Sequence, residues 1–429
     1  MSKVVELVAA LIASAGPRLR PLLSALAMHL QSLWLSSDPS SPLKLALIQA
    51  LTNLVKVARE DSIELHSLLV PVLGFATSGS DHSSFLTEEG LNLWLAVVRN
   101  AGSYSANLDE LFRINVPALI TAELIALHDH DKARTFMLIV ESYAILGGLN
   151  FLSSNANALK LIIDSSLCRV LPRVVAVVIR PLETMLLVCP TEAAVFLLQC
   201  GALSVMLRPC AAAVPVFAEA FAEFAEVDVA LLSYLSVVAR LLVAAPQVLQ
   251  QAASSLVEDG RVLLHGLLRL LVDKFDAVGY SSSVLWRRKL WCIAMLVMFN
   301  YGQNVDLKLL DWLPEILVLC DDVVAEQRAE SEHHPPNALS STSTDEEGSE
   351  AQPDPLALSF NRIIAADYVT TVSLRYLVSE QLEGLRRNIA SGVFDQIMRA
   401  VEPAAVERLM KRSNPNSPAV KLRRQVGII

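Results

Sequence analysis

The stretch LKLALIQALTNLVKVA, residues 43–58, decides the fold class. Its apolar side chains between Leu47 and Ala58 recur every three or four residues on one helical face, while Gln49, Asn53 and Lys56 lie opposite. Similar amphipathic stretches follow one another to about residue 325, separated by Gly, Pro, Ser or Asp, and no convincing strand pattern interrupts them. The sequence therefore predicts an all-α protein.

Prolines add a longer regularity to these predicted helices. Pro21, Pro71, Pro117 and Pro172 each begin or bend an apolar helix, at intervals of 50, 46 and 55 residues. HEAT and armadillo repeats, which are antiparallel helix pairs, have periods of about 40 to 47 residues. The spacing favours an α-α superhelix, a HEAT/armadillo-like solenoid; a helical bundle with coincidental prolines is the alternative.

Composition limits the classes of partner. With 53% hydrophobic residues and a net charge of −9, the chain has material for a large core and lacks the basic surface that nucleic acid binding needs. The most apolar stretches, 174–189, 228–245 and 285–302, are too charged or too short to span a bilayer. Residues 1–16 resemble a signal peptide, but Glu6 interrupts the apolar run, so a helix is the better interpretation. We expect no nucleic acid partner and no membrane insertion.

An acidic segment divides the predicted organisation. Residues 321–354 contain ten acids and one base, which accounts for the whole net charge. Its Ser, Pro and Glu content is typical of disorder. We therefore predict HEAT-like helical repeats over 1–328, an acidic disordered loop over 329–355, C-terminal helices completing the solenoid over 356–412, and a flexible basic tail over 413–429.

Two functions are predicted for the acidic segment. Its carboxylates would attract basic protein cargo through long-range electrostatics, with an inert solvated insertion as the alternative. Three hydroxyl residues each precede an acid by three positions, which suits acid-directed kinases. The candidate cargo-attracting acids are Asp321, Asp322, Asp345, Glu346, Glu347 and Glu350, and the candidate phosphorylation sites are Thr342, Ser343 and Thr344.

Motifs of catalysis are missing from the sequence. It contains no GxxxxGK[ST], GxGxxG, HExxH or GxSxG pattern. The cluster from His128 to Asp131 has metal-ligating groups, but two adjacent His-Asp pairs in one short turn cannot all converge on one ion, so a polar loop is the better interpretation. The six cysteines form no CxxC pair and are expected to be buried, reduced thiols. We predict no enzyme, catalytic residue, metal or cofactor.

Five segments along the chain carry a resemblance to a known family. They are LRPLLSALAMHLQSLW (19–34), LTEEGLNLWL (86–95), RRKL (287–290), DYVTTVSLRYLVSEQL (367–382) and VFDQIMRAVEPAAVERL (393–409). In the same order, they resemble segments of the importin-β (karyopherin) family of nuclear transport receptors. The resemblance spans nearly the whole chain but matches only the C-terminal portion of such a receptor.

The resemblance implies a HEAT solenoid that acts in nuclear protein import as the cargo-handling part of a receptor. Its implied partners are protein cargo, phenylalanine-glycine nucleoporins and the small GTPase Ran in its GTP form, and its implied localisation is shuttling between cytoplasm and nucleus. The family's main Ran contact lies in N-terminal repeats outside the matched portion, so we expect this chain to lack it. The alternative function is a HEAT-repeat scaffold or adaptor of a multiprotein complex with no transport role.

Overall fold

The computed structural model describes residues 1–78, 84–121, 130–167, 172–226, 228–279, 285–299, 307–333 and 353–410. Every regular element in these ranges is a helix, so the predicted all-α class is confirmed. The chain forms two compact units, of which the first contains residues 1–193 and 346–362 and the second contains 194–345 and 363–429.

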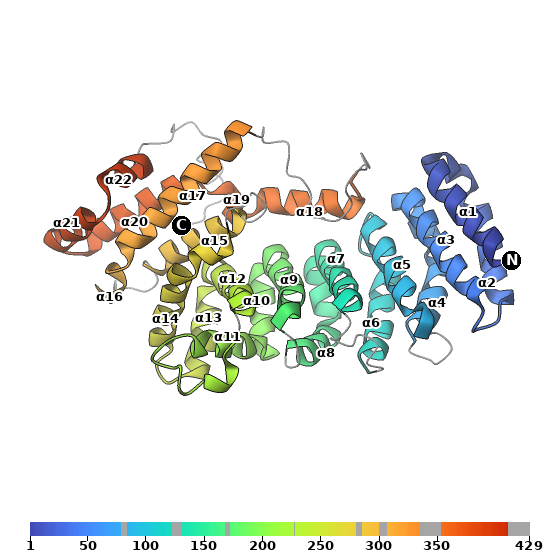
Figure 1. Ribbon diagram of the computed structural model, residues 1–429, viewed down its shortest axis with the longest axis horizontal. Coiled ribbons are helices and arrows are strands. Elements are labelled where there is room, and N and C mark those ends of the chain that lie inside the picture. The colour runs from blue at the N-terminus through green and yellow to red at the C-terminus, as the bar shows by residue number, and fades with distance from the viewer. Residues whose placement is uncertain are drawn as a thin grey trace. The chain divides into compact units, whose positions relative to one another are not determined.

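The first unit is a stack of helices in two layers (Figure 1). One layer runs α1, α3, α5, α7, α9, each helix packing on the next, and the second layer contains α4, α6 and α8. This alternation is the arrangement expected of stacked helix pairs. The bounds are α1 Ser2–Ala15, η1 Gly16–Leu22, α2 Leu23–Ser36, α3 Pro42–Ala58, η2 Arg59–Leu65, α4 His66–Ala76, η3 Ser84–Leu86, α5 Thr87–Asn100, α6 Ala106–Thr121, α7 His130–Ser154, α8 Ala156–Leu167 and α9 Pro172–Val188.

The helix that the sequence analysis began with, α3, is buried on two sides. It begins where the hydroxyl of Ser41 accepts a hydrogen bond from the backbone N–H of Leu43, with Pro42 in the first helical turn. The same helix packs against α1 on one side and α5 on the other. An internal helix of a stack therefore needs two apolar faces, and α3 has both.

A buried aromatic cluster joins α5, α6 and α7. The indole Nε1 of Trp94 donates a hydrogen bond to the hydroxyl of Tyr143 at 3.0 Å, and that hydroxyl donates to the carbonyl of Leu108 at 3.0 Å. Phe112 and Phe151 pack on the Tyr143 ring at 4.8 and 5.4 Å between centroids. The Trp94 segment is therefore the core of the first unit, with its polar atoms satisfied.

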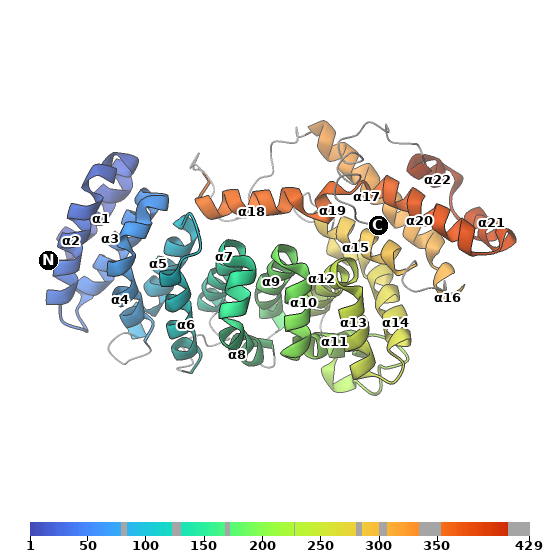
Figure 2. The same ribbon diagram turned by 180° about the vertical axis from the view of Figure 1, so that it is seen from behind.

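The second unit is built around α15, whose residues 288–296 are all buried. Helices α12, α17 and α20 pack around it, and both views show α17 and α20 beside it (Figures 1 and 2). Two helices cross the border between the units, α10 Pro190–Gln199 and α18 Pro355–Ala366. The others are α11 Ala202–Ala212, η4 Ala222–Phe224, α12 Asp228–Ala244, α13 Pro246–Leu256, α14 Gly260–Asp273, η5 Phe275–Val278, α15 Leu285–Met298, α16 Leu307–Leu310, α17 Leu313–His333, α19 Tyr368–Thr371, α20 Leu374–Asn388, α21 Ser391–Ala400 and α22 Pro403–Met410.

The prolines lie at helix starts or inside helices, as their positions predicted. Pro21 is in the 3₁₀ helix η1, Pro71 and Pro117 lie inside α4 and α6, and Pro172 begins α9. The acidic segment differs from its predicted bounds, because α17 continues to His333, into the range predicted as loop. Ala329 and the two glutamates that follow favour helix, and this propensity extends α17. Residues 334–352 and the predicted tail from 413 lie outside the described residues.

One described segment, Asp131–Ser154 of α7, is long and apolar enough to cross a membrane, and 61% of its most apolar window is buried inside the protein. A core helix of a soluble protein meets the same criterion. Five cysteines are buried without a disulfide, as expected for structural thiols, and Cys168 lies outside the described residues. Burial raises the pKa of Cys189 to about 11, which keeps the thiol protonated at neutral pH.

Candidate functional site

A shallow groove lies between α7 and α9 in the first unit. Its volume is about 240 Å³. Apolar side chains form most of its wall, and three charged residues border it. The lining residues are Met137, Leu138, Ala176, Val177, Pro181, Arg134, Glu141 and Arg180.

A fixed ion pair forms one wall of this groove. The buried carboxylate of Glu141 on α7 lies 2.8 Å from the Nε of Arg180 on α9, and it accepts a hydrogen bond from the Thr184 hydroxyl at 3.0 Å. The Arg180 side chain is half exposed at the rim. The pair therefore links α7 and α9 along this side of the groove.

A proline interrupts the helical hydrogen bonding beside the groove. Pro181 lies inside α9 and has no N–H, so the carbonyl of Val177 lacks its usual helical hydrogen bond. Both residues line the groove, whose apolar wall fits an apolar side chain of a bound peptide.

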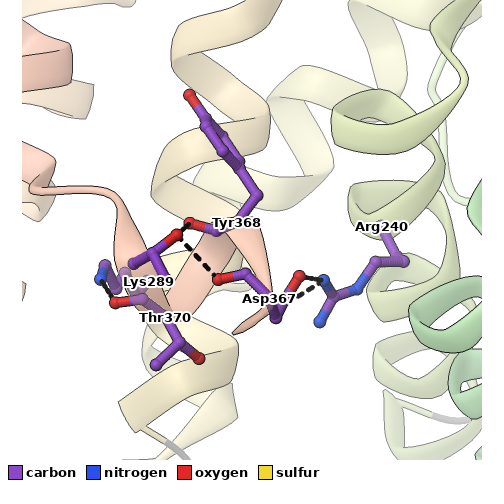
Figure 3. A network of polar contacts seen from close by, with 6 residues as sticks. Arg240, Lys289, Asp367, Tyr368 and Thr370 are labelled. Carbon is purple, nitrogen blue, oxygen red and sulfur yellow. Dashed lines mark hydrogen bonds and ion pairs between the residues drawn. The ribbon is translucent and has the colours of Figure 1, made fainter. Parts of the chain in front are cut away.

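A second cluster of polar contacts lies in the second unit (Figure 3). Arg240 on α12 donates through Nη1 to both carboxylate oxygens of Asp367, at 3.0 and 2.9 Å. Lys289 on α15 donates to the carbonyl of Thr370 at 3.1 Å. Burial lowers the pKa of Lys289 to about 8. These buried charges fasten the segment that contains α19 to α12 and α15.

This cluster joins two segments that resemble the transport receptors. Lys289 belongs to RRKL and Thr370 belongs to DYVTTVSLRYLVSEQL, 81 residues later. Arg288, the residue before Lys289, pairs with Glu326 of α17 at 3.2 Å, and its guanidinium lies 4.4 Å from the centre of the Phe275 ring. The matching residues therefore act as structural anchors between helices.

The first two candidate cargo-attracting acids lie in a helix, and one of them is buried. Asp321 and Asp322 lie in α17, and the Asp321 carboxylate is buried against Arg408 of α22, with the Nε–Oδ2 distance 2.8 Å. A carboxylate that an arginine holds between packed helices is not free to attract basic cargo. Asp322 lies on the exposed side of α17. Partial removal from water raises the pKa of its carboxyl, and the negative charge of the neighbouring Asp321 raises it further. The other candidates, Asp345, Glu346, Glu347, Glu350, Thr342, Ser343 and Thr344, lie outside the described residues.

The described residues contain no group of three or more His, Cys, Asp or Glu side chains that could hold a metal ion. Of the cluster from His128 to Asp131, His128 and Asp129 lie outside the described residues, and Asp131 is exposed in the first turn of α7.

Sequence reasoning missed the groove. Glu141 is the only charged residue between residues 135 and 154, and Arg180 follows an apolar run of six residues in α9. A lone charge in an apolar helix signals a partner on a neighbouring helix, because an unpaired buried charge is costly. The sequence therefore indicates that Glu141 and Arg180 each have a partner, but it does not show which residue that partner is.

Comparison with known proteins agrees with this architecture. A family model described as "Importin-11-like, TPR repeats" matches residues 45–414. Importin-11 of Homo sapiens and of Mus musculus are each 23% identical to this chain over 419 residues. The match covers 95% of this chain and 40% of each relative, so the chain spans less than half their length.

The fold is shared with a solved structure. A novel bidirectional nuclear transport receptor of S. cerevisiae has a TM-score of 0.67 and 15% sequence identity to this chain, covering 91% of this chain and 41% of the other. This likeness confirms the predicted α-α superhelix, and TPR and HEAT repeats are both stacked helix pairs. Because the family model spans most of the chain, the protein belongs to the importin-11-like family of TPR-repeat proteins.

Proposed function

We propose that this chain is the C-terminal, cargo-handling portion of an importin-β-family receptor acting in nuclear protein import. The observation that supports this function most strongly is the family match over residues 45–414, together with a fold shared with a nuclear transport receptor. Stacked helix pairs offer extended surfaces for protein partners without any catalytic group. The protein would shuttle between cytoplasm and nucleus with protein cargo, and its main contact with Ran in the GTP form would lie outside this chain.

The groove between α7 and α9 is our proposed docking site for phenylalanine-glycine nucleoporins. A recess of about 240 Å³ with apolar walls can accommodate one aromatic side chain. The Val177 carbonyl can accept a hydrogen bond from the backbone of the following glycine, which has no side chain to obstruct the approach. Weak binding at such grooves suits rapid passage through a pore.

The test is binding of the purified chain to immobilised phenylalanine-glycine repeats. Ala176 lies exposed in the groove, so Ala176→Glu should place a carboxylate in the recess and lower retention at least about fivefold without unfolding the protein. Ala404→Glu, at an exposed position on α22, is the matched control and should bind like the parent chain. Equal retention of all three proteins would remove the groove from the proposal, and no retention of the parent chain would favour a scaffold without a transport role.

We also propose that the acids from Asp345 to Glu350 attract basic cargo. Asp322, which is exposed on α17, would contribute to the same attraction. Phosphorylation of Thr342, Ser343 or Thr344 would add about −1.5 to −2 charges at each site and strengthen that field. Protein isolated from its source cells should change mobility on a phosphate-affinity gel after phosphatase treatment. Unchanged mobility would count against phosphorylation and would leave the attraction by carboxylates to be tested separately.

A further inference from the structure

The segment that joins α11 to α12 presents apolar side chains to solvent. Its sequence over residues 214–226 is VPVFAEAFAEFAE, and its backbone follows a series of turns and the short 3₁₀ helix η4. The side chain of Val216 is 74% exposed. Three aromatic rings beside it are only partly covered, and they belong to Phe217, Phe221 and Phe224. A soluble chain rarely exposes such a group of apolar side chains unless a partner covers them.

The same segment has exposed negative charge. Glu219, Glu223 and Glu226 are exposed, and none of them forms an ion pair with another residue that the structure describes. Residues 209–239 contain no Lys or Arg. The segment therefore fits a partner surface in which cations border an apolar recess, because complementary charge selects partners and speeds their encounter.

The groove between α7 and α9 has these complementary properties. Apolar side chains form most of the wall of its recess of about 240 Å³. Arg134 and Arg180 border the recess and are exposed, whereas the acid that lines it, Glu141, is buried. The charge that the groove presents to an approaching protein is therefore positive.

We propose that the segment 214–226 of one copy of this protein docks in the α7–α9 groove of a second copy. Val216 enters the apolar recess, and the glutamates that follow it lie toward the arginines at the border. Each copy carries both surfaces, so association needs no other protein. The two surfaces differ, so a copy with a defective groove still offers an intact segment.

Other partners for the segment fit less well. Membrane surfaces recruit clusters of Lys and Arg, which residues 209–239 lack. An unrelated basic protein would supply the charge, but the groove of this chain supplies both the charge and the recess. Nucleoporin repeats would compete with a second copy for the groove. Self-association is measured without nucleoporins and does not require their binding, so either proposal can fail alone.

The test is the average mass of the purified chain, measured by sedimentation equilibrium from about 1 to 100 μM, a range that detects weak contacts. We expect the mass to rise above 46.7 kDa with concentration, and to rise less at high salt. Val216→Lys places a cation beside the arginines, and Ala176→Glu places a carboxylate in the recess. Each should raise the dissociation constant at least about tenfold. Val229→Lys, at an exposed apolar position on α12, is the control and should associate like the parent chain.

Mixing the two defective proteins makes the test specific to this contact. Ala176→Glu keeps its segment and Val216→Lys keeps its groove, so the mixture should form a one-to-one complex that neither protein forms with itself. Both positions are exposed, so both variants should fold. A parent chain that stays monomeric over the whole range would overturn the proposal and leave the segment to a different partner. Association that neither variant weakens, or that mixing does not restore, would also overturn it.

Discussion

At the scale of single residues, charges buried between helices keep the stack in register. Glu141 shows the principle, because its carboxylate is buried and has two partners, the Arg180 guanidinium and the Thr184 hydroxyl. A buried charge that loses its partner costs more than the intact pair contributes. Removing one partner should therefore destabilise the protein more than replacing both.

We expect Arg180→Met to lower the free energy of unfolding by about 1 to 3 kcal/mol, a range reduced because Arg180 is half exposed. The double variant Arg180→Met with Glu141→Gln should cost less than the single one, because no buried charge is left unpaired. Urea denaturation of the three proteins measures this difference. A double variant that is less stable than Arg180→Met would show that the pair itself stabilises the fold.

His66 should make stability fall in weak acid. The residue is buried at the start of α4, neither ring nitrogen has a hydrogen-bond partner among the described residues, and burial lowers its pKa. The unfolded chain, with a pKa near the ordinary ~6.5, binds this proton more readily than the folded chain. The contribution of His66 to stability is therefore complete above about pH 6.5 and is lost as the pH falls below it.

His66→Leu should flatten that dependence between about pH 6.5 and 5, while His29→Gln, at an exposed position on α2, should leave it as in the parent chain. Thermal unfolding at a series of pH values measures it. Identical profiles for His66→Leu and the parent chain would show that His66 stays neutral in both states or is protonated in both.

At the scale of elements, the α19 segment is held in place by charges from two helices. Asp367→Asn would leave the buried Arg240 guanidinium without its counter-ion, and we expect a loss of about 3 to 5 kcal/mol in unfolding free energy. Hydrogen exchange should accelerate first in residues 367–374, which this ion pair fastens. Asp164→Asn, which breaks the exposed pair with Lys160, is the control and should change stability by about 0.5 kcal/mol or less. Unchanged exchange in 367–374 would contradict the anchoring role.

The helices themselves could be predicted from sequence, but their partners could not. The period of three to four residues identified α3, and the prolines indicated the repeat spacing, because both are local patterns. The bond from Lys289 to Thr370 and the ion pair of Arg408 with Asp321 join residues 81 and 87 positions apart. Asp321 was predicted to attract cargo because it begins the acidic segment, yet its distant partner Arg408 makes it part of the helix packing.

At the scale of the whole molecule, the acidic segment should contribute long-range attraction. Deleting residues 334–350 keeps α17 and α18 intact and removes four candidate acids. We expect binding of a basic cargo protein to weaken several-fold on deletion, and the salt dependence of binding to become shallower, because fewer carboxylates remain to be screened. Replacing the segment with a Gly-Ser linker of equal length is the control for chain length. Equal affinity of the parent and linker proteins from low to high salt would contradict the role.

The measurement that tests the central claim most directly is the distribution of the fluorescently labelled chain in permeabilised cells. If the chain is part of a nuclear transport receptor, it should concentrate at the nuclear rim, and Ala176→Glu should reduce that signal while Ala404→Glu does not. An even distribution, the same as that of an inert protein of 46.7 kDa, would contradict the account.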